Sequence, residues 1–456
     1  MPLQKNQVLT LRVERLSSDG SGVAHSPDGE TVFIPGAAPG DEARVRIVKD
    51  CKRYAFGILD EVLTPSPDRI PVDCAVAGPC GGCSLRHLDY AAELRAKQEN
   101  VADAFARIGG LDVPVLPIVG SPEVNRYRNK VQFPVGVDKS GKPCIGFYAG
   151  RTHRIVPCPD CRLQPGVLNE IGNALCAFFA EKGIQPYSEE TGRGLVRHIF
   201  LRRGAHSGQI MVCLVCTRAR LPSAEELCTR LKAQFAEITT ILLNVNAKNT
   251  NVILGTETHT LYGQGYIEDT LCGVPVQLGP LSFYQVNTLA AEQLYGIAAQ
   301  YAQLTQDDLL LDLYCGMGTI GLSMAAHCRE LIGVEIVPEA IESAKANAAR
   351  MGTDVAAKSR FFCADAGQAA TRLAAEGLHP DIVMLDPPRK GCDEATLSAV
   401  VRMSPRRVVY VSCNPATAAR DAAWLEQNGY HAEKVQPVDL FPRTRHCECV
   451  LSFSKV

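Results

Sequence analysis

A regular alternation of apolar, strand-like runs with helical segments occupies the chain from about residue 306 onward. A glycine turn and a helix from about Ile320 follow the first run, and a helix over 338–351 follows the second. The strand-like runs are residues 309–313, 330–335, 381–386 and 407–412. Apolar strands separated by helices are typical of a parallel sheet that is covered on both faces. This half therefore predicts a doubly wound α/β domain.

The turn from Asp312 to Gly321 has the spelling G-x-G-x-x-G, with Gly316 as its first glycine. Glycines at the carboxyl end of a strand let the backbone approach a bound nucleotide closely. Glu335 ends the next strand, where a carboxylate can accept hydrogen bonds from both hydroxyls of a ribose. The turn alone therefore fits a dinucleotide as well as another adenosine cofactor.

Asp386 ends a later strand of the same predicted sheet and is followed by Pro387 and Pro388. A dehydrogenase has no evident use for an acid and two prolines at that face, whereas methyltransferases acting on nucleobases commonly carry such a motif beside the reactive methyl group. Helix capping is the other interpretation of Asp386. In combination with the glycine turn and Glu335, the motif favours S-adenosylmethionine as cofactor.

Cys413 ends the following strand, so we expect it at the same face as Asp386. For an isolated cysteine a buried structural role is the default, but a strand end before a helix start favours a reactive thiolate. A thiolate that attacks carbon 6 of uracil makes carbon 5 nucleophilic towards a methyl group, and a base must then remove the carbon 5 proton. Glu448 is the candidate base, and His446 competes with it.

These motifs together resemble the RNA uracil-5-methyltransferase family, and the resemblance covers nearly the whole chain. The motifs are Ser282 to Asn287, Tyr314 to Gly316, Asp386 to Arg389, Ser412 to Pro415 and His446 to Val450. The resemblance implies that Cys413 is the nucleophile and Glu448 the proton acceptor, with Asp386 also orienting the uracil. It further implies that S-adenosylmethionine is contacted by Gln285, Tyr314, Glu335 and Asp386.

The chain has 19 cysteines, and three of them, Cys74, Cys80 and Cys83, are closely spaced in a glycine-rich stretch. Such spacing allows a tetrahedral zinc or a four-iron cluster, with Cys158 or Cys161 as fourth ligand. The family resemblance favours a [4Fe-4S] cluster with Cys161. Six other cysteines lie in apolar patterns and are predicted to be buried: Cys176, Cys213, Cys216, Cys228, Cys272 and Cys363.

The chain is expected to be multidomain. Residues 1–62 read as short strands with glycine turns, which predicts a small β-barrel that resembles the TRAM domain, an oligonucleotide-binding barrel. Residues 63–262 predict a central α+β domain that carries the cysteine cluster, with a helix at about 91–108 that packs on the catalytic domain. Residues 263–456 form the predicted Rossmann-like methyltransferase domain.

The net charge of −2 gives no global sign of a polyanionic partner, but basic residues concentrate locally. Arg126 to Lys130 offers charge and one aromatic ring, and the stretch from Arg193 to Arg203 is basic without an acid between Arg193 and Arg203. Both favour RNA contact over a merely solvated face.

Relatives with both a barrel and a cluster mostly modify large-subunit ribosomal RNA, so the resemblance implies 23S rRNA or its precursor as substrate. Three alternatives remain: the same chemistry on tRNA, an N-methyltransferase, and a cluster-bearing RNA-binding protein with an inactive methyltransferase core. No membrane segment, signal peptide or obligatory protein partner is indicated, and a cytoplasmic location is expected.

Overall fold

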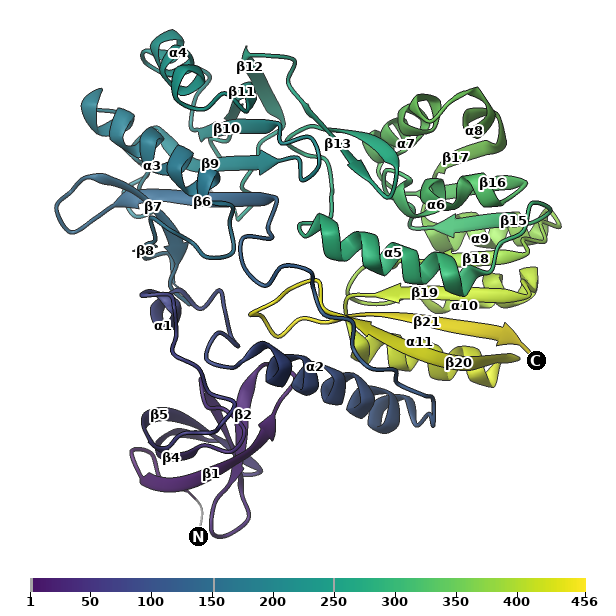
Figure 1. Cartoon of the computed structure of the whole chain (residues 1–456), viewed down its shortest axis with the longest axis horizontal. Coiled ribbons are helices and arrows are strands. Elements are labelled where there is room, and N and C mark those ends of the chain that lie inside the picture. The colour runs from purple at the N-terminus through teal and green to yellow at the C-terminus, as the bar shows by residue number, and fades with distance from the viewer. Residues whose placement is uncertain (1–2, 151, 249–250) are drawn as a thin grey trace. The chain divides into compact units, whose positions relative to one another are not determined.

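The computed structural model describes residues 3–150, 152–248 and 251–456 (Figure 1). The chain divides into two compact units, each built from separate segments of the sequence. Unit 1 comprises Met1–Val124, Pro388–Gly391 and Ser412–Leu451. Unit 2 comprises Asn125–Pro387, Cys392–Val411 and Ser452–Val456.

Unit 1 begins with a closed five-stranded barrel of strand order β1-β2-β3-β5-β4. Its strands are β1 (Val8–Leu16), β2 (Ser21–His25), β3 (Thr31–Pro35), β4 (Glu42–Asp50) and β5 (Tyr54–Thr64). Apolar side chains alternate along the strands, and the inward set, which includes Val13, Ile34 and Ile47, forms the barrel core. The small barrel predicted from the sequence is confirmed.

Two helices and one strand supply most of the remaining regular structure that lies wholly in unit 1. These elements are α2 (Tyr90–Ala104), α11 (Pro415–Gln427) and β20 (Tyr430–Val438). The side chain of Asp89 caps α2 by accepting a hydrogen bond from the Ala92 N–H, with 2.8 Å between the heavy atoms. A π-helical turn, η1 (Phe105–Gly109), continues α2, so the helix predicted at about 91–108 is present. A short helix, α1 (Ala77–Cys80), lies in the cysteine-rich stretch.

Unit 2 begins with a seven-stranded sheet of order β12-β11-β10-β9-β6-β7-β8. The strands are β6 (Lys130–Val137), β7 (Pro143–Tyr148), β8 (Ile155–Pro157), β9 (Val196–Arg203), β10 (Ile210–Cys216), β11 (Ile238–Val245) and β12 (Glu257–Tyr262). Helices α3 (Gly166–Glu181) and α4 (Ala224–Gln234) share a hydrophobic core with it. This is the predicted central α+β fold. The domain boundaries at residues 62 and 262 stay a prediction.

A second seven-stranded sheet has the order β17-β16-β15-β18-β19-β21-β20. Strands β15 (Leu309–Leu313), β16 (Glu330–Glu335), β17 (Ser359–Cys363), β18 (Ile382–Leu385) and β19 (Arg407–Ser412) pair in parallel. Strand β21 is Glu448–Lys455, and the hairpin β13 (Ile267–Leu271) and β14 (Val274–Leu278) precedes the sheet. Strands β15, β16, β18 and β19 begin within one position of the apolar runs that predict them, whereas no run predicted the edge strand β17.

Helices connect the strands of this sheet: α5 (Thr288–Ala302), α6 (Thr319–Met324), η2 (Ala325–His327), α7 (Pro338–Arg350), α8 (Thr353–Lys358), α9 (Ala366–Ala375) and α10 (Glu394–Met403). The predicted doubly wound domain is therefore confirmed. No helix among the described residues has the length and apolarity that crossing a membrane requires.

Two of the six cysteines predicted to be buried are not. Cys363 is exposed, and Cys272 is partly exposed. Cys363 ends β17, which is an edge strand with one neighbour, so an apolar run there is covered on fewer sides than in a central strand. Cys272 lies in the turn between β13 and β14 with a left-handed backbone φ of 49°.

Candidate functional site

Three carboxylates lie at the carboxyl ends of neighbouring parallel strands in unit 2. Asp312 belongs to β15, Glu335 ends β16, and Asp386 follows β18. Burial raises the pKa of Asp312 to about 8, and the charges of Asp386 and Glu335 add to the shift. Burial also raises the pKa of Asp386 to about 7. Such a group of acids disfavours its own ionisation and so favours a cationic ligand.

Asp312 shapes the glycine turn and keeps one oxygen without a partner. Its Oδ2 accepts a hydrogen bond of 3.0 Å from the Gly321 N–H, and a Cβ at Gly321 would lie 2.8 Å from that oxygen. Gly318 adopts the left-handed φ of 79° that glycine tolerates. Among the described residues, nothing donates a hydrogen bond to the buried Oδ1 of Asp312. An orphaned acceptor in an acidic site fits a ligand that carries positive charge.

Glu335 is held in place by the backbone around it. Its Oε1 accepts hydrogen bonds from the N–H groups of Ile336 and Val337 at 2.9 and 3.0 Å, and Oε2 accepts one from Gly316 at 3.1 Å. The side chains of Ile336 and Val337 are 61% and 45% exposed. A fixed carboxylate beside exposed apolar surface suits a ribose next to a base, as the sequence predicts for Glu335.

The buried Tyr295 of α5 interacts with two of the predicted cofactor residues, Gln285 and Asp386. The hydroxyl of Tyr295 lies 3.5 Å from the Thr319 hydroxyl. Burial raises the pKa of Tyr295 most, the charge of Asp386 raises it further, and hydrogen bonds with Thr319 and Gln285 oppose the shift. Tyr295 was not predicted as a site residue, because a tyrosine in an apolar helical pattern resembles an ordinary core position.

Asn129 anchors the backbone of Gln285 from the central sheet. Its Nδ2 donates hydrogen bonds to the Gln285 carbonyl at 2.7 Å and to the Thr288 hydroxyl at 2.9 Å. The side chain of Asn287 caps α5 by accepting from the Ala290 N–H. Asn129 lies inside the basic stretch from Arg126 to Lys130, where a lone amide gives no sequence signal of this role.

Tyr314 has a left-handed φ of 66°, which non-glycine residues seldom adopt and which recurs at functional sites. Its hydroxyl lies 3.3 Å from that of Thr396 in α10. Burial raises the pKa of this hydroxyl, and the neighbouring Cys392 adds to the shift. The contact of Tyr314 with S-adenosylmethionine stays a prediction.

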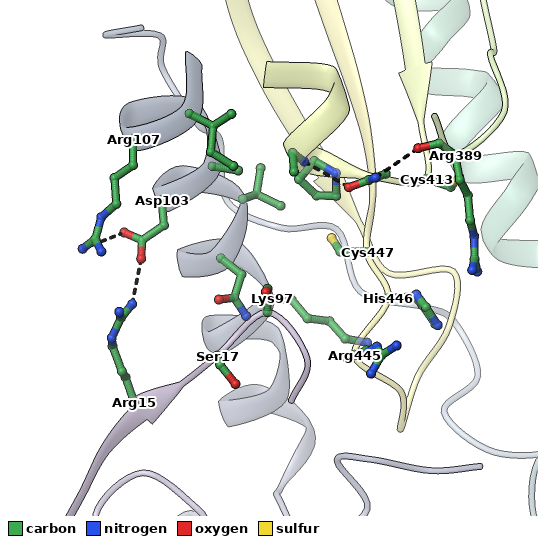
Figure 2. A pocket seen from close by; sticks show the side chains of 18 residues that line it. Arg15, Ser17, Lys97, Asp103, Arg107, Arg389, Cys413, Arg445, His446 and Cys447 are labelled. Atoms are coloured by element: carbon green, nitrogen blue, oxygen red, sulfur yellow. Dashed lines mark hydrogen bonds and ion pairs between the residues drawn. The ribbon is translucent and has the colours of Figure 1, made fainter. Parts of the chain in front are cut away.

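Cys413 lines a cavity of about 510 Å³ that lies wholly within unit 1 (Figure 2). One wall comes from the end of β1 and from α2 with η1. The opposite wall comes from Arg389, from Cys413 and the start of α11, and from residues 445–447. Cys413 is half-buried, so its thiol is neither a core residue nor fully in solvent. The volume lies in the range of pockets that enclose a drug-sized ligand.

The segment beside Cys413 is fixed by the start of α11. Asn414 caps this helix and donates from Nδ2 to the Arg389 carbonyl at 3.0 Å. The hydroxyl of Thr417 lies 3.3 Å from the same carbonyl, and Arg420 donates to the Lys390 carbonyl at 2.9 Å. The residues that follow the Asp-Pro-Pro motif are therefore held against the helix that Cys413 precedes.

A buried ion group joins α2 to the C-terminal segment of unit 1. Lys97 is 2% exposed, and its Nζ lies 2.8 Å from Glu93 Oε1 and 2.8 Å from Asp439 Oδ1. The Arg443 N–H donates to Glu93 Oε1 at 2.7 Å, and the Tyr90 hydroxyl donates to Asp439 Oδ2 at 2.9 Å. These bonds fix the segment that leads into the cavity-lining residues 445–447.

Glu448 directly follows the lining residue Cys447 and is 4% exposed. The Sγ of the next residue, Cys449, lies 3.8 Å from the carbonyl of Ser412, which precedes Cys413. The two predicted catalytic residues therefore belong to adjoining parts of unit 1. His446, the competing base, lines the cavity, and its ring packs edge-on against Phe441 with 6.0 Å between ring centroids.

Cys74, Cys80 and Cys83 lie half-buried in unit 1, and Cys161 belongs to unit 2. A hydrogen bond with Cys158 is the largest cause that lowers the pKa of Cys161 to about 6. Within the part of the chain that the structure describes, no three His, Cys, Asp or Glu side chains are arranged to hold a metal ion. The cysteine cluster thus stays a prediction.

The prediction of RNA contact is wrong for three side chains of the two basic stretches, because they are buried. Tyr127 is 6% exposed, so its ring is not open to stack on a base. Arg202 is 1% exposed and donates to the carbonyls of Gly279 and Ser282 at 3.1 and 2.7 Å. Arg197 is also buried, beside Glu189 and the Lys248 carbonyl. The two arginines hold loops of unit 2 through these contacts instead of facing RNA.

Comparison with known proteins agrees with this architecture. The model of the tRNA (uracil-5-)-methyltransferase family matches residues 206–456, more than half of the chain. The chain belongs to this family. A TRAM domain model matches residues 2–59, which include most of the five-stranded barrel. The family resemblance of the sequence motifs is confirmed, and the protein is an S-adenosylmethionine-dependent RNA methyltransferase.

Relatives and one solved structure span the full length of this methyltransferase. Uncharacterized RNA methyltransferases of Halalkalibacterium halodurans and Oceanobacillus iheyensis are 43% and 41% identical, and each alignment covers 98% of this chain and 97% of the relative. The crystal structure of Pyrococcus abyssi tRNA (uracil-54, C5)-methyltransferase with S-adenosyl-L-homocysteine has a TM-score of 0.78 at 26% identity. That match covers 98% of this chain and 100% of the other.

The acidic group predicts that cofactor affinity rises with pH. The pKa values of about 8 and about 7 mean that Asp312 is mostly protonated and Asp386 about half protonated near pH 7, and that both lose their protons as the pH rises. A cationic ligand stabilises their ionised forms, so S-adenosylmethionine binding releases protons and strengthens, by roughly tenfold, as pH rises through this range. Calorimetric titration across that range measures it.

S-adenosylhomocysteine, which lacks the sulfonium charge, is the matched ligand and should show a weaker pH dependence. Asp312→Asn should flatten the S-adenosylmethionine profile. An affinity that falls or stays constant with rising pH would contradict the electrostatic assignment.

The buried ion group predicts a large stability loss in Lys97→Met. Removing the cation leaves Glu93 and Asp439 buried without their partner, at a cost of about 3–5 kcal/mol in the free energy of unfolding. Arg95→Gln is the control, since Arg95 lies on the same helix in an ion pair with Asp68 and is 57% exposed. The control should lose less than about 1 kcal/mol. Urea unfolding measures both, and equal losses would disprove the role of the buried group.

Proposed function

We propose that the protein methylates carbon 5 of a uracil in RNA through a covalent intermediate on Cys413. The carrying observation is that Cys413 lines a cavity large enough for a nucleotide, at the start of a helix that also fixes Arg389. Family membership and the Pyrococcus abyssi relative, named for C5 methylation of a uracil in tRNA, support the same chemistry.

The reaction needs a nucleophile and a base in sequence. The Cys413 thiolate adds to carbon 6, and the electron pair of the carbon 5–carbon 6 double bond moves toward the carbonyl at carbon 4. Carbon 5 then bonds to the methyl group, while the bond of that group to the sulfonium sulfur breaks and leaves its electron pair on the sulfur. Glu448 removes the remaining carbon 5 proton, the double bond re-forms, and the bond between sulfur and carbon 6 breaks to release Cys413.

The residues of unit 2 fit S-adenosylmethionine, which supplies an electrophilic methyl group when it is bound. The orphaned Oδ1 of Asp312 and the acids around it suit the cationic end of this molecule. Glu335, with exposed apolar surface beside it, suits the adenosine. Gln285 and Asp386, which both interact with Tyr295, would lie near the reactive methyl end of S-adenosylmethionine. Tyr314 is proposed to contact the same cofactor.

The proposed substrate is 23S rRNA or its precursor, which the resemblance of the sequence motifs implies for a chain with both a barrel and a cysteine cluster. The second candidate is tRNA, which the printed name of the Pyrococcus abyssi relative favours. The cysteines Cys74, Cys80, Cys83 and Cys161 are proposed to hold a [4Fe-4S] cluster. Iron and sulfide assays on protein purified without oxygen test this, and zinc in place of iron would refute it.

Variants of the catalytic pair should fail at different steps. Cys413→Ala should form neither the adduct nor 5-methyluridine, because addition to carbon 6 is lost. Glu448→Gln should still add and methylate, but its turnover should fall by about 10²–10⁴-fold, because the carbon 5 proton is not removed. The measurement is 5-methyluridine formed on 23S rRNA and tRNA transcripts, with denaturing gels for the covalent complex.

Cys363→Ala and Glu376→Gln serve as controls, because both residues are exposed and neither lines the cavity. Undiminished methylation by Cys413→Ala would exclude the covalent mechanism. Methyl groups on an exocyclic amine would favour the N-methyltransferase alternative, and no methylation of either RNA by the wild type would favour an inactive core.

A further inference from the structure

The catalytic cavity of unit 1 is built partly by the N-terminal barrel. Arg15, at the end of β1, and Ser17 and Ser18, directly after it, line the cavity together with Cys413. The barrel segment and helix α2 form one wall of the cavity (Figure 2). The barrel is thus part of the cavity in which the nucleophile lies.

The charge on this wall is organised by one carboxylate. Asp103 Oδ2 lies 2.8 Å from Arg15 Nη1, and its Oδ1 lies 3.5 Å from Arg107 Nη2. Figure 2 shows the two guanidinium groups reaching Asp103 from β1 and from η1, the turn that continues α2. Asp103 therefore holds two positive charges side by side at the cavity, on two different elements.

These arginines keep donors free for a ligand. Their side chains are 47% and 67% exposed, and each guanidinium has five N–H donors, of which Asp103 occupies a minority. Ion pairs exposed to this degree stabilise a fold little, so stability alone does not account for the arrangement. A fork of oriented guanidinium donors is the group that recognises a phosphate.

Positive charge prevails around the rest of the cavity. Arg389 and Arg445 line the opposite wall, and both are exposed. The Lys97 charge is already neutralised by Glu93 and Asp439. Among the described residues that line the cavity, Asp103 is the one carboxylate. The cavity volume of about 510 Å³ also leaves room for more of the RNA than the reacting base.

We propose that Arg15 and Arg107, bracketed by Asp103, bind the backbone phosphates of a single-stranded RNA segment next to the target uridine. The barrel would then set which nucleotide reaches Cys413, beyond raising general affinity for RNA. This inference rests on the proposed function, because the ligand it places is the RNA substrate.

Salt dependence of binding tests the assignment. The protein is titrated with a fluorescent oligouridylate of about 12 nucleotides at several salt concentrations. Each phosphate contact to a single strand contributes about −0.7 to the slope of log affinity against log salt. Arg15→Gln/Arg107→Gln should reduce the magnitude of the slope by about 1.4. That change corresponds to about 25-fold weaker binding at about 0.1 M salt when affinities converge near 1 M.

Arg12→Gln/Arg95→Gln is the matched control, because it removes one exposed arginine from β1 and one from α2, and neither lines the cavity. The control should keep the wild-type slope. Equal slopes in the two double variants would overturn the proposal. Circular dichroism of both variants checks that the fold persists.

Methylation assays separate this inference from the proposed function. A wild type that makes 5-methyluridine, with a double variant that binds oligouridylate like the control, refutes the phosphate site alone. A wild type that makes none refutes the proposed function, whatever the slopes show.

Discussion

The buried pairing of Lys97 with Glu93 and Asp439 is the constraint on which the cavity of unit 1 depends. An ammonium group and two carboxylates that are buried away from water must stay paired, because a buried charge without its partner is strongly destabilising. The pairing joins helix α2 to the segment before residues 445–447, so the two cavity walls are fixed to each other. Cys413 is held separately, through the cap of α11 and its bonds to Arg389.

Opposite electrostatics distinguish the two sites within a chain of net charge −2. Unit 2 gathers Asp312, Glu335 and Asp386, whose mutual repulsion and burial suit a cation. The cavity of unit 1 exposes guanidinium groups and, among its described lining residues, one carboxylate, Asp103, which suits a polyanion. S-adenosylmethionine and RNA carry these opposite charges. The net charge of the chain does not reveal that one site is acidic and the other basic.

Much of the fold could be predicted from the sequence, because its cues are local. Four of the five parallel strands of the second sheet, β15, β16, β18 and β19, are apolar runs, and they appear where the pattern places them, while β17 was not predicted. Side-chain burial was harder to predict. Tyr127 and Arg202 read as RNA-facing residues, yet both are buried, since strand pairing and loop packing decide exposure. Asn129 acts through a hydrogen bond to Gln285, more than a hundred positions away in the sequence. Tyr295 acts through one buried hydroxyl beside Thr319. No local sequence pattern reveals either contact.

The central claim is that Cys413 becomes covalently attached to carbon 6 of a uracil. Mass spectrometry of peptides from protein incubated with S-adenosylmethionine and RNA containing 5-fluorouridine tests it most directly. Fluorine cannot leave as the carbon 5 proton does, so the intermediate accumulates. The account predicts a methylated fluorouridine nucleotide on the peptide that contains Cys413. An adduct on another cysteine, or no adduct with RNA that is methylated when unsubstituted, would contradict it.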